Sequence, residues 1–523
     1  MDKEHLRHQE DTRQVLHRLS RRATLGLSAL VGVIAGGLAV IFQLLIDATE
    51  STRAMVRGEL TGHGYVGGAI LILGGAALGA FAVFLTRRYC PEAAGSGIPH
   101  VKAVLLSARR LRPVPLVAVK LVGGLLALAA GMSLGREGPT VHIGAACAAY
   151  FAALLKLPHR TRRALIAAGA GAGLAAAFNA PLAGFLFIME ELRRDMSRET
   201  YGNALVTSVA SVLVARALLG SESDFLLSDV DTLPLSVVPA VMLTGLLASV
   251  VGVVFNRTLL TMVEWRESSR PEVLGALVGV LAGLLAIFLP SVTGGGHDLT
   301  LSLLEGQTPH WLGLLVVLLV IKLIFTALSF SSGVPGGILA PLLTLGALTG
   351  GLVGATLRQF SAGLASQPTF LATVGMAAVL SASVRAPLTG VVLIVEMTGQ
   401  YHLLYFLLLA SFVAYLAAEW FEHQPIYEAL LSRELHRGKA WAEAEEARVL
   451  ELSIEPGSRL DRARIDHYPL PHEVLIALIE REGKPVVPNG KTRLMAGDLL
   501  TVVAGPHCDD QALAKILDAS KAP

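Results

Sequence analysis

The sequence predicts an all-α polytopic membrane protein followed by a small soluble α/β domain. Three observations support this fold class: the composition, the spacing of the apolar runs and an internal repeat. Of the 523 residues, 53% are hydrophobic and only 16% are charged, whereas a typical soluble domain carries about 25% charged residues. The net charge of +2 gives no support to nucleic-acid binding.

Apolar runs of uneven length follow one another from 23–48 to 403–420. A straight membrane span needs about 20 apolar residues, and several runs are shorter or longer than that. Gly, Pro and Ser interrupt many of them. This pattern favours short, tilted and broken helices over a bundle of uniform spans.

An internal repeat divides the apolar part of the chain. APLAGFLFIME at 180–190 matches APLTGVVLIVE at 386–396, and Gly169 and Gly375 share this offset. A looser match pairs Gly135, Pro139, Gly144 and Ala145 with Gly337, Pro341, Gly346 and Ala347. We therefore expect two repeats, at about 23–220 and 236–400, as in transporters built from repeated halves. Chance similarity between Gly-rich apolar helices is the alternative.

The two ends of the chain differ from the apolar body. Residues 1–22 are charged and lack the apolar core of a secretory signal, so we expect a cytoplasmic N-terminal segment. Its Arg21-Arg22 end agrees with the positive-inside rule. Residues 431–447 form a charged linker, and 448–517 a small soluble module.

Within this module the sequence predicts strands at VLELSIE, KPVVP and LLTVV, and a short amphipathic helix at PHEVLIALIER. Asn489-Gly490 is a turn signal of the hairpin type. The NGKT at 489–492 lacks the earlier glycine of a phosphate loop, because Pro485 stands there. We therefore reject nucleotide binding at this stretch.

Nothing in the sequence predicts an enzyme, a metal site or a cofactor. Cys90, Cys147 and Cys508 lack the spacing of metal ligands or of a redox pair. There is no HExxH metal motif and no convincing nucleophile constellation.

Three stretches combine glycine, proline and polar groups inside the apolar body: GSGIP (95–99), GREGP (135–139) and GGILAP (336–341). Each leads into a plausible helix start, with proline near the first turn. Helix N-termini carry unpaired N–H groups and a positive dipole end, and glycine permits close approach of an ion. Taken together the stretches indicate an anion site, whereas each alone would suit a kink or a close helix contact.

These stretches resemble the CLC family of chloride channels and chloride/proton antiporters, in order and in spacing. AFNAPLAGFLFIMEE (177–191) and QPIYEAL (424–430) are also similar to family segments, and the resemblance covers about residues 25–430. It implies a transmembrane domain at 23–430 with two inverted repeats, assembled as a homodimer with one pore per subunit.

The resemblance assigns the anion ligands. Ser96 matches a hydroxyl that contacts the central chloride, and Tyr427 a phenol that contacts it from the other side. Ile338 and Leu339 match positions that offer backbone N–H groups. Leu339 replaces a frequent phenylalanine, from which we expect a changed pore shape and a preserved site.

Two glutamates carry the expected proton coupling. Glu137 matches the external gating glutamate, whose carboxylate occupies an anion position when ionised. Glu191 matches the internal proton-transfer glutamate of the antiporters, where channels usually have an apolar residue. A helix-end ion pair near Arg194 is the alternative for Glu191. Glu190 has a repeat counterpart in Glu396, so we expect that pair to be structural.

Other residues have supporting roles in this prediction. Lys120 and Arg136 shape the electrostatics of the anion path, or else stabilise helix packing. The backbone positions that form the three stretches are Gly95, Gly97, Pro99, Gly135, Gly138, Pro139, Gly337 and Pro341.

The resemblance thus predicts a chloride/proton antiporter in the plasma (inner) membrane of a prokaryote, with both termini cytoplasmic and with chloride, protons and membrane lipid as partners. A passive chloride channel is the alternative, which Glu191 argues against. A fluoride-selective relative is disfavoured by Ser96.

The stretch LPHEVLIALIEREGKPVVPNGKTRLMAGDLLTVVAGP (470–506) resembles the TrkA C-terminal (RCK-C) domain. Many CLC proteins carry CBS domains in this place instead. The resemblance implies dimeric association and regulation by a small ligand, which no residue identifies.

Overall fold

The computed structural model of the chain describes residues 3–193, 198–220, 225, 234–267, 270–307, 311–360, 368–436, 448–471, 473–481, 484–505, 508 and 510–522. The chain divides into two compact units. The first comprises Met1–Ile98 with Arg112–Ile426, and the second Pro99–Leu111 with Tyr427–Pro523. The second unit thus combines the C-terminal residues with a short segment that follows the GSGIP stretch.

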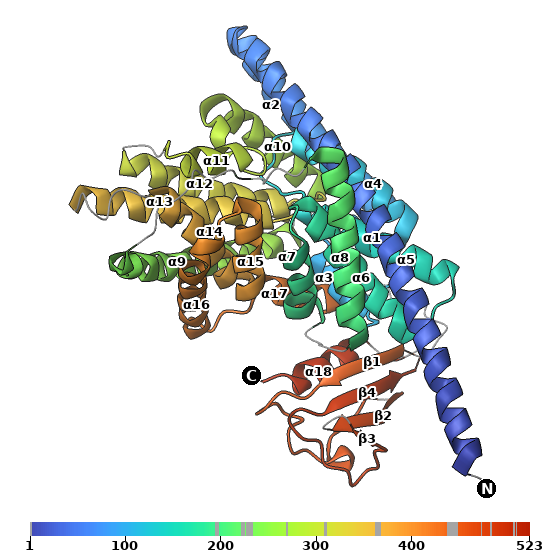
Figure 1. Ribbon diagram of the computed structural model, residues 1–523. Coiled ribbons are helices and arrows are strands. Elements are labelled where there is room, and N and C mark those ends of the chain that lie inside the picture. Colours follow the sequence, from blue (N-terminus) through green and yellow to red (C-terminus); the bar gives the residue numbers. More distant parts are fainter. Residues whose placement is uncertain are drawn as a thin grey trace. The chain divides into compact units, whose positions relative to one another are not determined.

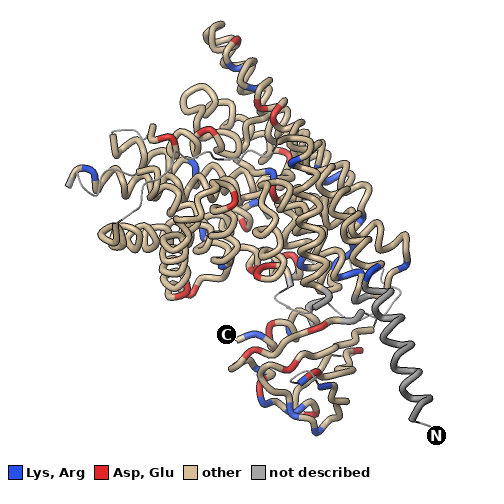
Figure 2. Tube along the Cα trace, viewed as in Figure 1, with Lys and Arg blue, Asp and Glu red and all other residues tan. Residues whose placement is uncertain are grey.

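The elements assigned in the described parts of the first unit are helices, joined by loops and turns (Figure 1). Long stretches of its helices carry no charged residue (Figure 2). Eight helices in the described part of the chain are long and apolar enough to cross a membrane, which confirms a polytopic membrane protein. Its α-helices are α1 (Lys3–Thr61), α2 (Gly64–Tyr89), α4 (Pro113–Ala129), α5 (Glu137–Leu154), α6 (His159–Ala177), α7 (Pro181–Phe187), α8 (Arg198–Leu219), α9 (Val238–Glu267), α10 (Pro271–Phe288), α11 (His297–Leu304), α12 (Leu312–Ser331), α13 (Leu339–Phe360), α14 (Pro368–Val384), α15 (Pro387–Thr398) and α16 (Leu404–Trp420).

The repeat seen in the sequence has a structural cause in the way helices cross. Helix α5 packs against α6, and α13 packs against α14. Gly144 faces Gly169 at the first crossing, and Gly346 faces Gly375 at the second; a Cβ at any of the four would overlap the facing backbone. Small residues let membrane helices approach closely, so each repeat keeps glycine at its crossing.

Helices α7 and α15 show that the repeats are inverted. Glu190, just after α7, accepts N–H bonds from Leu388 (3.2 Å) and Thr389 (2.7 Å) in the first turn of α15. Glu396, near the end of α15, accepts N–H bonds from Leu182 (3.1 Å) and Ala183 (2.8 Å) in the first turn of α7. Each glutamate therefore caps the N-terminus of the helix in the other repeat, where the dipole favours a carboxylate, and the two helices run antiparallel.

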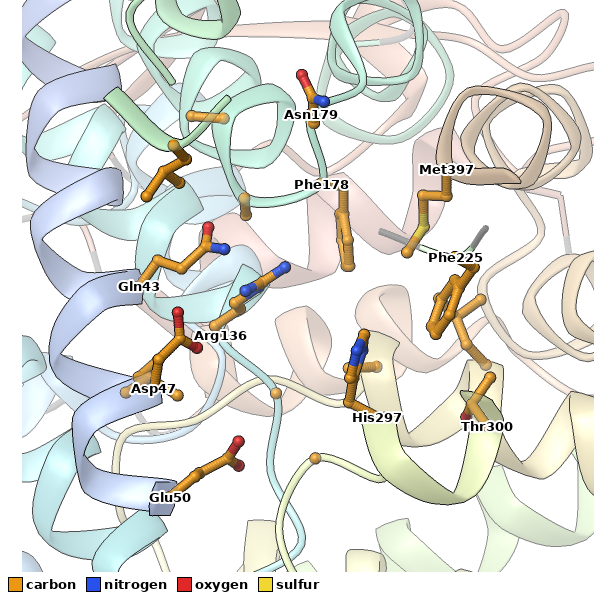
Figure 3. Close-up of a pocket in the computed structure, with 18 of the residues that line it drawn as sticks. Gln43, Asp47, Glu50, Arg136, Phe178, Asn179, Phe225, His297, Thr300 and Met397 are labelled. Atoms are coloured by element: carbon orange, nitrogen blue, oxygen red, sulfur yellow. The ribbon is translucent and has the colours of Figure 1, made fainter. Parts of the chain in front are cut away.

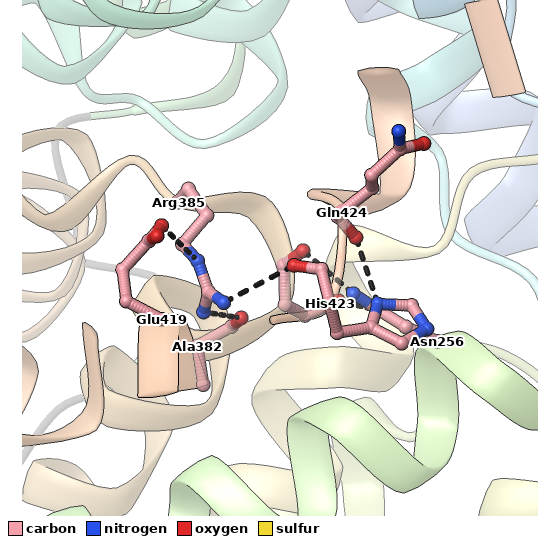
Figure 4. A network of polar contacts seen from close by, with 7 residues as sticks. Asn256, Ala382, Arg385, Glu419, His423 and Gln424 are labelled. Carbon is pink, nitrogen blue, oxygen red and sulfur yellow. Dashed lines mark hydrogen bonds and ion pairs between the residues drawn. The ribbon is translucent and has the colours of Figure 1, made fainter. Parts of the chain in front are cut away.

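The turns before these helices are also matched. Asn179 before α7 and Arg385 before α15 both have positive φ, 52° and 67°, which is uncommon for residues other than glycine. Arg385 is held by Glu419 (2.9 Å), by the carbonyl of Ala382 (2.6 Å) and by that of His423 (3.3 Å) (Figure 4). This network ties the turn to the last turn of α16, through Glu419, and to His423 after it.

The second unit contains an antiparallel sheet of order β1-β4-β2-β3. Its core includes Leu452, Ile476, Leu500, Val502 and Ile516. The elements of this unit are α3 (Ile98–Leu105), which begins at the last residue of the first unit, α17 (Ile426–His436), β1 (Arg448–Ser453), β2 (Val474–Arg481), β3 (Lys484–Val486), β4 (Leu499–Ala504) and α18 (Asp510–Ser520). Of the predicted linker, 431–436 continue α17, and 437–447 lie outside the described residues.

The predicted amphipathic helix at PHEVLIALIER is wrong, because this stretch forms β2. The two buried residues, Ile476 and Ile479, are three positions apart, as on a helix face. The spacing arises from a register shift between Ile476 and Leu478, since a β-bulge inserts one residue into the alternation of a strand. Asn489-Gly490 does form a turn, closed by the Thr492 N–H and the Asn489 carbonyl at 2.9 Å, but this turn does not join a hairpin, since β3 pairs with β2 and not with β4.

Asp498 is a buried residue whose hydrogen bonds stabilise this domain. Its carboxylate accepts two hydrogen bonds from Arg481, each 2.8 Å, and one from the Met495 N–H at 2.8 Å. Burial opposes ionisation, but these donors lower the pKa of Asp498 below its usual 3.8. The carboxylate therefore stabilises the folded domain at every pH above about 3.8, and this contribution is lost as the pH falls through the lower, folded pKa.

We expect Asp498→Asn to destabilise the domain by roughly 2 kcal/mol and to speed amide exchange in β4 roughly thirtyfold. Hydrogen–deuterium exchange of the full-length protein measures this at pH 7. The wild type should lose its advantage over the variant only below pH 3.8, after correction for intrinsic exchange. Asp466→Asn is the control: it removes an exposed ion pair with Arg464, which should matter little. An equal effect of both variants would contradict the prediction.

Candidate functional site

Two of the three glycine-rich stretches lie directly side by side, although they are far apart in sequence. Gly135 and Gly337 exchange backbone hydrogen bonds in both directions, at 2.9 and 2.8 Å. These bonds place the start of α5 beside the start of α13, so one helix end from each repeat contributes to a common site.

Glu137 is the first residue of α5 and is fully buried. Its Oε1 accepts a hydrogen bond of 2.6 Å from the backbone N–H of Leu339, the first residue of α13. A Cβ at Gly135 or Gly337 would overlap the Glu137 carboxylate, so a side chain at either position would displace the carboxylate from this place. The carboxylate thus lies at a helix N-terminus, where N–H groups and the dipole favour a negative charge.

The GSGIP stretch joins this pair. The N–H of Gly95 donates to the carbonyl of Val334, and the N–H of Gly336 donates to the carbonyl of Gly95, both at 3.0 Å. A Cβ at Gly138 would lie 2.8 Å from the Cα atoms of both Ser96 and Gly337. The Ser96 hydroxyl, which is buried, accepts the N–H of Ile98 at 3.3 Å. The starts of α3, α5 and α13 therefore converge on one buried place.

The other predicted residues divide between the two units. Ile338 and Leu339 are buried within this cluster. Pro139 and Pro341 lie in the first turns of α5 and α13 as expected, and Pro99 lies in that of α3. Tyr427 is fully buried at the second residue of α17 and belongs, with Pro99, to the second unit. The cluster described for the first unit therefore contains Ser96 but not Tyr427.

Lys120 supports the backbone of the cluster. Its Nζ is buried and donates to the carbonyl of Gly95 at 2.7 Å. Helix-end N–H groups and a lysine bonded to backbone give a positive environment without placing a free ammonium in the site. Such an arrangement can bind an anion and still release it.

A cavity of about 380 Å³ reaches this cluster from one side. Gly135, Arg136 and Ala340, which adjoin Glu137 and Leu339 in sequence, are among the residues that line it. Asp47 and Glu50 of α1 and His297 of α11 face the same hollow as Arg136 (Figure 3). Sequence reasoning singled out Arg136 but missed the acids and the histidine.

The glycine loop that precedes His297 has a signal in the sequence. Gly294-Gly295-Gly296 precede α11 as Gly95-Ser96-Gly97 precede α3, and the outer glycines have similar positive φ (66° and 92° against 63° and 87°). Lys322 is buried and donates to the carbonyl of Gly294 at 2.8 Å, as Lys120 does to Gly95. The loop behind His297 is thus the repeat counterpart of the GSGIP loop.

Glu191 lies in a π-helical turn, Ile188–Arg193, directly after α7. It is buried, while its neighbour Glu190 is partly exposed and caps α15. Consecutive residues of a helical turn point in different directions, which agrees with the different surroundings of the two glutamates, and π-helical turns are frequent at functional sites. The alternative partner Arg194 lies outside the described residues.

Comparisons with known proteins agree with this geometry. The TrkA-C domain matches residues 449–508. The H(+)/Cl(-) exchange transporter ClcA of Vibrio cholerae serotype O1 (strain M66-2) is 37% identical over 428 residues, which cover 80% of this chain and 91% of that protein. ClcA of Yersinia pestis bv. Antiqua (strain Angola) is 34% identical over 442 residues, with 82% and 90% covered.

Solved structures share the fold. A slow cyanobacterial Cl−/H+ antiporter superposes with a TM-score of 0.75 at 31% identity, over 79% of this chain and 98% of that one. A eukaryotic CLC transporter superposes with a TM-score of 0.68 at 24% identity, over 80% and 75%. The sequence model for voltage gated chloride channels matches residues 78–419. The chain therefore belongs to the CLC family of voltage gated chloride channels.

Proposed function

We propose that this protein is a secondary active antiporter that exchanges chloride for protons across a membrane. One observation carries the proposal: the Glu137 carboxylate accepts the N–H of Leu339 at 2.6 Å, inside a cluster of helix starts. A carboxylate can be seated there only because the place suits an anion. The names of the relatives, H(+)/Cl(-) exchange transporters, support the same function.

The mechanism follows from competition between two anions. Ionised Glu137 is attracted to the N–H groups and blocks the place beside Leu339. A proton removes its charge, the carboxyl group leaves, and chloride takes its place between Ser96 and the N–H groups of Ile338 and Leu339. Release of the proton returns the carboxylate and displaces the chloride. Chloride and proton movements are then linked because they use one site in turn.

Glu191 supplies the second proton position in this proposal. It is buried in the membrane unit, where an ionisable residue is expensive and usually functional. Tyr427 completes the chloride site from the start of α17. With only one acid, protons could reach the site from one side, and a gated passive channel would result.

We extend the proposal to the location, the assembly and the regulation of the protein. The protein resides in the plasma (inner) membrane of a prokaryote as a homodimer, with both termini cytoplasmic. The C-terminal domain binds a small regulatory ligand, as its likeness to a TrkA-C domain suggests.

The proposed exchange is tested in liposomes containing the purified protein and an outward chloride gradient. Exchange predicts proton uptake against the proton gradient, recorded with a pH electrode. Chloride efflux without coupled proton movement would instead support the passive channel.

Glu137→Gln should retain chloride efflux, lose proton uptake down to the level of empty vesicles, and lose the dependence of efflux on pH. A glutamine cannot ionise, so it leaves the place beside Leu339 to chloride. Glu272→Gln is the control, because that glutamate forms an exposed ion pair with Arg87. Retained proton uptake in Glu137→Gln would exclude Glu137 as the gate.

Glu191→Gln should likewise abolish proton uptake, while chloride binding measured by titration calorimetry stays within a factor of two of the wild type, an energy well below one hydrogen bond. The split between coupling and binding distinguishes proton transfer from a structural role. If chloride binding falls together with proton uptake, Glu191 is needed for the fold of the site, and its assigned role is wrong.

A further inference from the structure

Glu428 is shared between two lysines from distant parts of the chain. Its Oε1 lies 2.8 Å from Nζ of Lys102, and its Oε2 lies 3.5 Å from Nζ of Lys521. The side chains of Lys102 and Glu428 are only 6% and 16% exposed, and that of Lys521 is 43% exposed. All three residues belong to the second unit.

The places of Lys102 and Glu428 in the sequence connect them to the proposed chloride ligands. Lys102 lies on α3, the short helix that begins two residues after Ser96. Glu428 directly follows Tyr427 on α17. A helical segment moves as a rigid element over such short distances, so the ion pair joins the helix that follows Ser96 to the helix that carries Tyr427.

A second contact supports the same pair of segments. Nη2 of Arg109, shortly after α3, donates to the carbonyl of Glu434 at 2.6 Å. This carbonyl lies in the last turn of α17, where carbonyl groups need outside donors. The two segments are thus joined near both ends of α17.

Lys521 is positioned by the sheet domain. The N–H of Glu455 donates to the carbonyl of Ser520 at 2.8 Å, and the N–H of Leu460 donates to that of Ala519 at 3.1 Å. The N–H of Ala522 in turn donates to the Glu455 carboxylate at 3.0 Å. The residues on both sides of Lys521 are therefore bonded to the loop that follows β1, and Lys521 moves with the domain.

We propose that Lys102 and Glu428 are positioning residues for the chloride site, and that Lys521 is the contact through which the C-terminal domain acts on them. The inference rests on the proposed roles of Ser96 and Tyr427. Loss of either member of the Lys102–Glu428 pair loosens α3 relative to α17 and therefore weakens chloride binding. Loss of Lys521 removes the second contact of the Glu428 carboxylate and has a smaller effect of the same kind.

The test is a charge exchange, read out as chloride affinity of the full-length protein by isothermal titration calorimetry. Lys102→Glu and Glu428→Lys should each weaken chloride binding by about tenfold, within the usual range for coupled sites. The double variant restores the opposite charges and should recover the wild-type affinity to within about threefold. A double variant no better than the single ones would overturn the positioning role.

The role of Lys521 is tested separately with milder variants, which leave the buried lysine in place. Lys521→Gln should weaken chloride binding by about threefold, as expected for a partly exposed ion pair, and should have no effect in a Glu428→Gln background. Lys515→Gln is the control, since Lys515 is exposed on α18, the helix that ends directly before Lys521. An effect of equal size in both backgrounds would show that Lys521 does not act through Glu428.

Ser96→Ala and Tyr427→Phe separate this inference from the proposed function. If neither variant changes chloride affinity, the assigned chloride ligands are wrong, and this inference fails with them. If they weaken binding but the charge exchange does not restore it, the chloride site stands and the positioning role is refuted.

Discussion

The hydrogen bond between the Glu137 carboxylate and the Leu339 N–H depends on most of the membrane unit. It requires α5 and α13 to begin at the same place, which the paired backbones of Gly135 and Gly337 ensure. Those helices are held by their close crossings with α6 and α14, which need glycine at Gly144 and Gly346. The positions of the carboxylate, of the backbone donors and of the helix crossings therefore depend on one another.

The inverted repeat produces this arrangement from two similar halves. Each repeat contributes a helix start to the buried cluster and a glutamate that caps a helix of the other repeat. The repeats have diverged where their surroundings differ. Ser96 stands in the loop before α3, and Gly295 stands in the corresponding loop before α11, where a cavity with Arg136 and His297 opens. Common backbone geometry therefore provides two unlike environments in the two repeats.

Several features of the fold and the candidate site could be predicted from the sequence. Composition and apolar runs gave the membrane class, and two offsets gave the repeat. The expected clustering of the three glycine-rich stretches agrees with the observed contacts around Gly135, Gly337 and Ser96. Asp47 and Glu50 were missed because each lies in an ordinary helical context, and His297 was missed although the glycine loop before it matches the GSGIP loop. The strand β2 was mistaken for a helix because its bulge gives Ile476 and Ile479 a helical spacing.

The sequence by itself determined that the chain lies in a membrane, the order of its helices and the residues that interrupt those helices. The transfer of apolar side chains from water and the conformational preferences of glycine and proline act over a few residues. Their effects can therefore be predicted from a single sequence. Only the tertiary structure decided which distant groups meet: Glu137 with Leu339, Glu190 with α15, and Glu428 with Lys102 and Lys521. Such contacts depend on helix crossings and registers that many residues set jointly, so no local sequence pattern predicts them.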